Sequence, residues 1–229
     1  MKILGFQKLT MLDYPEKMAC LIFTAGCNFR CPFCHNALLV TDIDGEQISQ
    51  DEIFAYLKKR KGILEGVCIT GGEPLLNKDI REFIKKIKDI GYPVKIDTNG
   101  SNPDLLESLI NDGLVDYVAM DIKSSPEKYA LVAGVDSIDI NAIDKSIKLL
   151  LQGRVDYEFR TTVCAPLHDK SDFVAIGKWI KGAKKYYLQA FVDSGHIIGE
   201  NLSQLPKTEI ESFVSVVSPF VQKVEIRGI

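Results

Sequence analysis

The chain has 229 residues, of which 46% are hydrophobic and 26% charged, and its formal net charge is -3. This length allows one large domain with a sizeable core, and the composition is that of an ordinary globular protein. The small negative charge excludes a broad surface for polyanions. No stretch approaches a membrane span, which needs about 18 apolar residues, and the N-terminus lacks a signal-peptide profile. We therefore expect a cytoplasmic protein with no membrane segment and no nucleic-acid partner.

Apolar runs rich in β-forming residues alternate along the chain with helical patterns. The periodicity predicts strands over residues 17–26, 66–72, 92–100, 115–123, 155–165, 185–192 and 221–228. It predicts helices over residues 48–62, 76–91, 102–113, 139–152, 171–183 and 208–217.

Several helix ends carry recognisable start and stop signals. Ser49 and Glu52 have the spacing of a capping box at the start of one helix. Thr208 has the same relation to Glu211 at the last helix. Asn102 is followed by a proline, which favours a helix start, and Gly91 is suited to end the preceding helix.

About six β-α units follow one another in this order, which implies a parallel sheet with right-handed crossovers and helices outside it. The sheet could be doubly wound or a barrel, complete or partial. We predict an α/β fold of the partial (β/α)6 TIM-like barrel type. The sequence contains no linker or low-complexity tract, so we expect a single domain over residues 1–229.

Polar clusters fall at equivalent places in these units. A cysteine-rich loop (24–36), TGGEP (70–74), DTNG (97–100), MDIK (120–123) and FRTT (159–162) each lie at or near the C-terminal part of a predicted strand. Active sites of parallel α/β folds form at that edge of the sheet. We therefore expect the five clusters to meet in one site.

The chain has six cysteines, and three of them stand alone in apolar runs. Cys20, Cys68 and Cys164 are expected to be buried thiols on strands, because free cysteine is among the most buried residue types. A reducing cytosol argues against a disulfide framework and makes a clustered set more consistent with metal binding or catalysis.

The other three cysteines lie within the loop TAGCNFRCPFCHN with the spacing C-x3-C-x2-C. Structural zinc needs four closed ligands, and His35 is a poor fourth ligand because it directly follows Cys34. A four-iron cubane held by Cys27, Cys31 and Cys34 would instead leave one iron without a protein ligand. An open position is typical of catalytic metal sites. A chance cluster of core cysteines is the remaining alternative.

The motif with Phe33 before its third cysteine resembles the radical S-adenosylmethionine (radical SAM) superfamily. TGGEP matches the GGEP element of that family, and DTNG and MDIK resemble segments of the glycyl-radical-enzyme activases. The run over residues 12–36 is most similar to anaerobic ribonucleoside-triphosphate reductase activating proteins. The resemblance is closest over residues 8–165. Glu16 departs from the pattern, because that subfamily usually has glycine there.

This resemblance implies a cofactor site around a 4Fe-4S cluster. Cys27, Cys31 and Cys34 would ligate the cluster, while S-adenosylmethionine would chelate the fourth iron through its amino and carboxylate groups. His35 and Asn36, which follow the last cysteine, are expected to form hydrogen bonds around the cluster loop. The residues that the resemblance assigns to the cofactor are Phe33, Gly71, Gly72, Glu73, Asp97, Asn99, Lys123, Arg160 and Gln189. Asp97, Thr98 and Asp121 would also bind a monovalent cation, since hard oxygen ligands suit such an ion.

The family reductively cleaves S-adenosylmethionine to a 5′-deoxyadenosyl radical, with flavodoxin or ferredoxin as the electron donor. For this chain the resemblance implies hydrogen abstraction from a glycine of an anaerobic ribonucleotide reductase or of another glycyl radical enzyme. A small-molecule enzyme such as 7-carboxy-7-deazaguanine synthase is an alternative. A non-catalytic electron carrier is a third, although a carrier would gain nothing from an open iron. Packing roles are expected for Tyr129 and Trp179, and loop or surface positions for His168 and His196.

Overall fold

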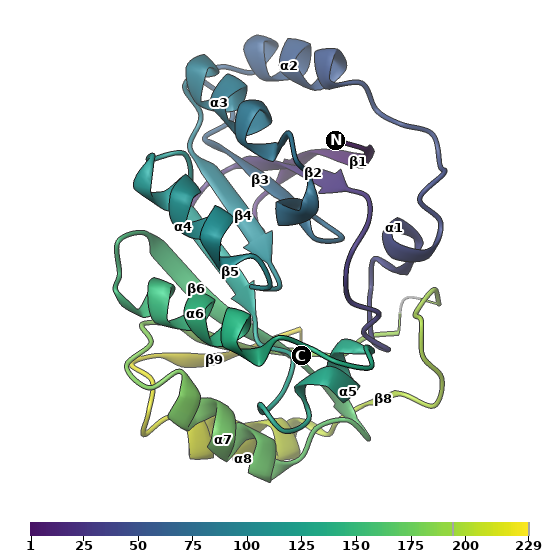
Figure 1. The fold of residues 1–229 in the computed structure, drawn as a ribbon, viewed down its shortest axis with the longest axis vertical. Helices are drawn as coiled ribbons and strands as arrows, with labels where there is room; N and C mark the ends of the chain where they lie inside the picture. The colour runs from purple at the N-terminus through teal and green to yellow at the C-terminus, as the bar shows by residue number, and fades with distance from the viewer. Residues whose placement is uncertain (194, 229) are drawn as a thin grey trace.

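The computed structural model describes residues 1–193 and 195–228, and its strands form one curved sheet with helices outside it (Figure 1). The strands are β1 (Ile3–Thr10), β2 (Ala19–Thr24), β3 (Gly66–Gly71), β4 (Val94–Thr98), β5 (Tyr117–Asp121), β6 (Asp156–Ala165), β7 (Tyr186–Ala190), β8 (Ser203–Gln204) and β9 (Val224–Arg227). The helices are α1 (Ala37–Thr41), α2 (Gln50–Lys59), α3 (Ile80–Ile90), α4 (Pro103–Asn111), α5 (Tyr129–Ala133), α6 (Ile140–Leu151), α7 (Lys170–Trp179) and α8 (Lys207–Val217), with a 3-10 turn η1 (Pro74–Leu76).

The strand order is β1-β2-β3-β4-β5-β6-β7-β9, with β8 paired to β6 away from this path. Every neighbouring pair from β2 to β9 along the path is parallel, whereas β1 is antiparallel to β2. Within the described residues no pairing joins β1 to β9, so the barrel stays open. This arrangement confirms the predicted partial α/β barrel. The single domain over residues 1–229 stays a prediction.

The helices form where apolar residues recur at helical spacing. In α3, Ile80, Phe83, Ile84 and Ile87 are buried together, and each such side chain stabilises the fold by about 1.5–3 kcal/mol relative to exposure. Gly91 ends this helix with φ of +101°, as predicted. No helix among the described residues is long and apolar enough to cross a membrane.

The predicted helix starts were correct at two of three sites. The Ser49 side chain accepts a hydrogen bond from the Glu52 backbone N–H, and the Asn102 side chain caps α4. The prediction for Thr208 was wrong, because α8 begins one residue earlier and has no side-chain cap. The sequence reading also missed the antiparallel β1, whose lysine and glutamine interrupt its apolar pattern.

Glu16, the departure from the subfamily pattern, lies in the hairpin between β1 and β2. Its backbone has φ of +63°, which is the left-handed region that favours glycine. The glycine that the subfamily usually has at this position would therefore fit the same turn without strain. Glu16 lies outside the cysteine loop and the strand ends, so the departure leaves the predicted site unaffected.

Candidate functional site

A cavity of about 420 Å³ opens at the C-terminal ends of the parallel strands. The five polar clusters meet there, as expected from the geometry of parallel sheets. The predicted site residues that line it are Cys27, Cys31, Phe33, Cys34, Gly71, Gly72, Asp97, Thr98, Asn99, Asp121, Lys123, Arg160 and Gln189. His35 and Asn36 line it as well. Glu73 is the predicted site residue that does not.

The cysteine loop follows β2 and is held from outside by backbone contacts. The Arg30 N–H donates to the Ala133 carbonyl at 2.8 Å, and the Gly199 N–H donates to the Pro32 carbonyl at 2.8 Å. A Cβ atom at Gly134 would lie 2.1 Å from the Arg30 oxygen, so only glycine permits this approach. The loop is thus shaped by segments far along the chain.

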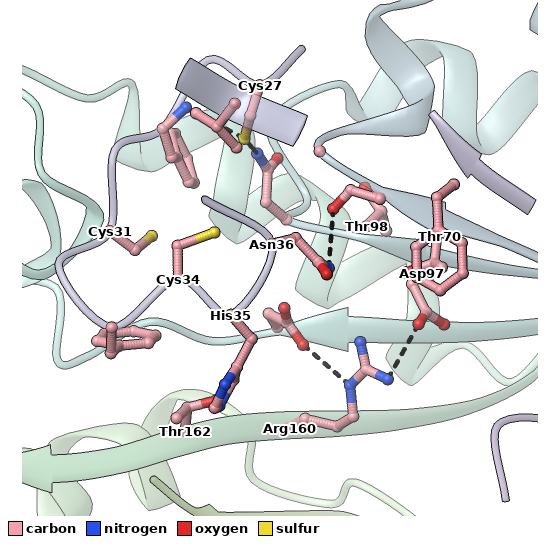
Figure 2. Close-up of a pocket in the computed structure, with 18 of the residues that line it drawn as sticks. Cys27, Cys31, Cys34, His35, Asn36, Thr70, Asp97, Thr98, Arg160 and Thr162 are labelled. Atoms are coloured by element: carbon pink, nitrogen blue, oxygen red, sulfur yellow. Dashed lines mark hydrogen bonds and ion pairs between the residues drawn. The ribbon is translucent and has the colours of Figure 1, made fainter. Parts of the chain in front are cut away.

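The three thiols lie along this loop on one side of the cavity (Figure 2). No group of three or more His, Cys, Asp or Glu side chains in residues 1–193 and 195–228 converges on a position for one metal ion. This argues against a mononuclear site and is compatible with a cubane, in which each thiolate binds a different iron. Burial raises the pKa of Cys31 to about 11, so ligation there would release a proton.

Gly71 and Gly72 let β3 lie directly against the start of the cysteine loop. Gly71 has φ of +117°, and a Cβ there would lie 2.3 Å from the Thr24 carbonyl oxygen. A Cβ at Gly72 would lie 2.0 Å from the carbonyl oxygen of Gly26. Both positions therefore require glycine, and their backbone borders the cavity.

Glu73 is not among the residues that line the cavity, and its predicted contact with a ligand amino group stays a prediction. Its side chain is buried and accepts hydrogen bonds from Thr98 Oγ1 at 2.8 Å, from the Asn99 N–H at 2.6 Å and from the Leu75 N–H at 3.1 Å. Burial raises its pKa to about 7, although these hydrogen bonds act in the opposite direction. Glu73 ties the GGEP turn to the DTNG loop.

Asn99 is directed at the cysteine loop. Its Nδ2 donates to Asn28 Oδ1 at 2.8 Å and lies 3.9 Å from Cys27 Sγ, while its Oδ1 accepts from the Ser101 N–H at 2.9 Å. A hydrogen bond to a cysteine sulfur tunes the metal site that the sulfur holds. The side chain of Asn36 does not reach a sulfur in this way but donates to the Gly71 carbonyl at 3.4 Å.

A row of alternating charges crosses β4, β5 and β6 beside the cavity, and Figure 2 shows its centre, where Arg160 pairs with Asp97. Arg160 donates to Asp121 Oδ1 at 2.9 Å and to Asp97 Oδ2 at 3.3 Å. Lys123 donates to Asp121 Oδ2 at 2.9 Å, and Lys95 pairs with Asp97 Oδ1. Burial opposes ionisation of Asp121, but Arg160 and Lys123 outweigh it and lower its pKa to about 2.

The predicted monovalent-cation site does not fit this arrangement. Both carboxylates expected to bind the ion, Asp97 and Asp121, already pair with protein cations through both oxygens. The hydroxyl of Thr98 is committed to Glu73 and to the Gly100 N–H. Lys95 was not among the predicted site residues.

His168 lies in the loop between β6 and α7, which agrees with the predicted loop or surface position, but its side chain is buried. Its Nε2 lies 2.8 Å from the Lys123 carbonyl, and its ring centroid lies 6.1 Å from that of Phe33. The packing roles of Tyr129 and Trp179 are confirmed by their edge-to-face contact at 5.9 Å. Cys20, Cys68 and Cys164 are buried on strands, as predicted. His196 is exposed.

Fold, cysteine loop and cavity together define a class of protein that builds a cofactor site on an open α/β barrel. The Radical SAM superfamily matches residues 21–180 of the chain. The chain therefore belongs to the radical SAM superfamily, whose members use a 4Fe-4S cluster and S-adenosylmethionine.

Among individual relatives, a Methanocaldococcus jannaschii protein provisionally named as a glycyl-radical enzyme activating enzyme is 34% identical over 98% of this chain and 95% of its own length. A 7-carboxy-7-deazaguanine synthase from Koribacter versatilis is 34% identical over 58% of this chain and 56% of its own. A Thermococcus kodakarensis protein provisionally named GTP 3′,8-cyclase is 35% identical over 56% of this chain and 42% of its own.

Solved structures share the fold at low sequence identity. Streptococcus suis SuiB bound to S-adenosylmethionine superposes with a TM-score of 0.67 and 14% identity, over 91% of this chain and 50% of that one. The structure of anSMEcpe with bound AdoMet gives a TM-score of 0.62 and 16% identity, over 89% and 61% of the two chains. The chain thus spans about half of the first of these structures, and the likeness shows the fold alone.

Proposed function

We propose that the chain is a radical SAM activase that generates a glycyl radical on a protein partner, an anaerobic ribonucleotide reductase or another glycyl radical enzyme. The observation that carries this proposal is the match to the M. jannaschii relative over nearly the full length of both chains. The K. versatilis 7-carboxy-7-deazaguanine synthase matches 58% of this chain, and the GTP 3′,8-cyclase relatives match up to 90% of this chain but no more than 64% of their own length. We further propose that the protein acts in the cytoplasm.

In this proposal Cys27, Cys31 and Cys34 hold the cluster. When bound, the cluster and S-adenosylmethionine supply the electron transfer and the radical that abstracts hydrogen. The protein binds and orients these groups and keeps water away from them. Phe33 is buried beside the thiols and covers the cluster side of the cavity.

Charged groups on the floor of the cavity suit the carboxylate of the cofactor. Arg160 and Lys123 each keep N–H groups beyond those used on Asp121 and Asp97, and both line the cavity. Charge-assisted hydrogen bonds of this kind orient a carboxylate strongly. Gln189, on β7 at the cavity wall, is proposed to contact the adenosine part.

Replacing Cys31 tests the cluster assignment. Cys31→Ala should abolish cofactor cleavage and the iron–sulfur absorption after anaerobic reconstitution, because a cubane with two protein ligands is not retained. Cys20→Ala is the matched control, since Cys20 is equally buried but lies on β2 away from the cavity. Retained cleavage in Cys31→Ala, with a folded chain by circular dichroism, would reject the assignment.

The target is tested by electron paramagnetic resonance. The reconstituted, reduced protein is mixed anaerobically with S-adenosylmethionine and the anaerobic ribonucleotide reductase of its host, with flavodoxin or ferredoxin as the proposed physiological donor. A glycyl-radical doublet together with 5′-deoxyadenosine supports the activase. Cofactor cleavage without the doublet moves the target to another glycyl radical protein or to a small molecule. Absence of cleavage would revive an electron-carrier role.

A further inference from the structure

Lys95 is a buried cation on β4, two residues before Asp97 and on the same face of the strand. Its side chain is 1% exposed, and its ammonium pairs with Asp97 Oδ1 and lies 3.7 Å from Cys68 Sγ. Lysine is almost never fully buried unless it is paired. Burial lowers the pKa of Lys95, but attraction to Asp97 outweighs it and raises the pKa, so the side chain stays charged.

The ammonium lies where the aspartates would otherwise attract an ion. Lys95 takes one oxygen of Asp97, and Arg160 takes the other at 3.3 Å. Arg160 and Lys123 divide the two oxygens of Asp121 between them, at 2.9 Å each. Three protein cations thus neutralise two carboxylates, and a mobile cation would have to displace one of them.

We infer that Lys95 is a positioning residue that takes the place of a bound monovalent cation in this protein. Its fixed charge keeps Asp97 ionised and in place, and Asp97 in turn holds the Arg160 guanidinium toward the cavity. Binding of S-adenosylmethionine is then insensitive to whether sodium or potassium is present. The inference rests on membership of the radical SAM superfamily and does not depend on which partner is activated.

The test is the affinity of the anaerobically reconstituted protein for S-adenosylmethionine, measured by equilibrium binding in NaCl, KCl and choline chloride at equal ionic strength. The wild-type Kd should agree within about twofold among the three salts. Lys95→Met keeps most of the apolar stem and removes the charge, which leaves Asp97 Oδ1 open to an ion. Its Kd should rise about tenfold in choline chloride and recover at least about threefold in NaCl or KCl.

Two further variants keep the test decisive. Lys88→Met removes a lysine that pairs with Asp116 at 2.7 Å outside the cavity, so its Kd should match wild type in every salt. Lys95→Met combined with Asp97→Asn removes both buried charges, so it should fold even if the single variant does not. Its Kd should not respond to sodium or potassium, because the carboxylate that would bind the ion is gone.

Three results would overturn the inference. A wild-type Kd that changes more than about fivefold among the salts would show that a mobile cation is required. A folded Lys95→Met whose Kd matches wild type, or is weakened without recovery in NaCl and KCl, would assign Lys95 to packing alone. A salt response in the double variant would place the ion elsewhere. A failed glycyl-radical assay would leave these binding results unchanged, so the two proposals fail separately.

Discussion

Two carboxylates near the cavity, those of Glu73 and Asp121, have pKa values shifted in opposite directions. Glu73 is surrounded by neutral donors, namely one hydroxyl and two backbone N–H groups, and burial raises its pKa to about 7. Asp121 is only partly buried, with its side chain 30% exposed, and Arg160 and Lys123 overcome the effect of burial and lower its pKa to about 2. Burial disfavours either charge, so the neighbours decide which carboxylate stays ionised. Glu73 joins two loops, whereas Asp121 anchors the cations that face the cavity.

The largest effect on this contrast is expected from removing Arg160, which pairs with both Asp97 and Asp121. Arg160→Met leaves Asp97 paired with Lys95 alone and Asp121 with Lys123 alone, so each keeps one carboxylate oxygen without its cation, and the free energy of unfolding should fall by about 3–5 kcal/mol near pH 7. Chemical denaturation under anaerobic conditions measures this loss. The gap to wild type should narrow as the pH falls from 3.8 towards about 2, where the Asp121 contribution is lost.

Lys88→Met serves as the control for this variant, because its ion pair with Asp116 is partly exposed. Exposed pairs contribute less than about 1 kcal/mol. An Arg160→Met variant that loses no more stability than this control would contradict the account of the buried row of charges.

Glu73→Gln sharpens the contrast. The side-chain NH2 of glutamine is a hydrogen-bond donor, and it would face groups that themselves donate to Glu73. We expect a loss of about 1–3 kcal/mol in the free energy of unfolding. The pKa of Glu73 rises from 4.5 to about 7 on folding, so its contribution is greatest below pH 4.5 and falls by about 3 kcal/mol as the pH rises through 7. The penalty of the variant should therefore be larger at pH 5 than at pH 8. A penalty that grows with pH would mean that Glu73 is ionised like the aspartates.

His168→Gln is expected to have the smallest effect. The Lys123 carbonyl can only accept, so His168 Nε2 carries the proton, and Nδ1 accepts from the Cys164 N–H at 3.3 Å. Burial lowers the pKa of His168 below 6.5, so wild-type stability should fall as the pH drops below 6.5. The variant should lose about 1 kcal/mol at pH 8 and show a flatter pH dependence between pH 6.5 and 5. Thermal unfolding measured at pH 8 and between pH 6.5 and 5 tests both expectations. If stability changes with pH as steeply in the variant as in the wild type, His168 is not the source of the pH dependence.

The strand ends could be predicted from the sequence because parallel strands bring their carboxyl ends to one edge. The cysteine loop, Gly71, Gly72 and Arg160 all reach the cavity for this reason. The orientation of individual acids could not be predicted in the same way. Glu73 and Asp97 both come after apolar residues of a strand. Only their neighbours in space show that Glu73 forms buried hydrogen bonds between two loops and that Asp97 belongs to the row of charges.

Buried polar residues were the main source of error. The burial of Lys95 and His168 was not predicted, since charged and polar side chains are usually exposed. The inside of an open barrel accepts them when a partner is close, as Asp97 is to Lys95 on the same strand and the Lys123 carbonyl is to His168. The Lys123 carbonyl is 45 residues from His168 in the sequence, so no local pattern reveals that contact, whereas Asp97 is two residues from Lys95.

The outside contacts on the cysteine loop have a consequence for repair. Arg30 and Pro32 form backbone hydrogen bonds with Ala133 and Gly199, and these bonds do not involve the thiols. If oxygen removed iron from the site, the cysteine loop would therefore keep its conformation. Rebuilding the cluster would then require iron, sulfide and a reductant, but the loop would not have to refold.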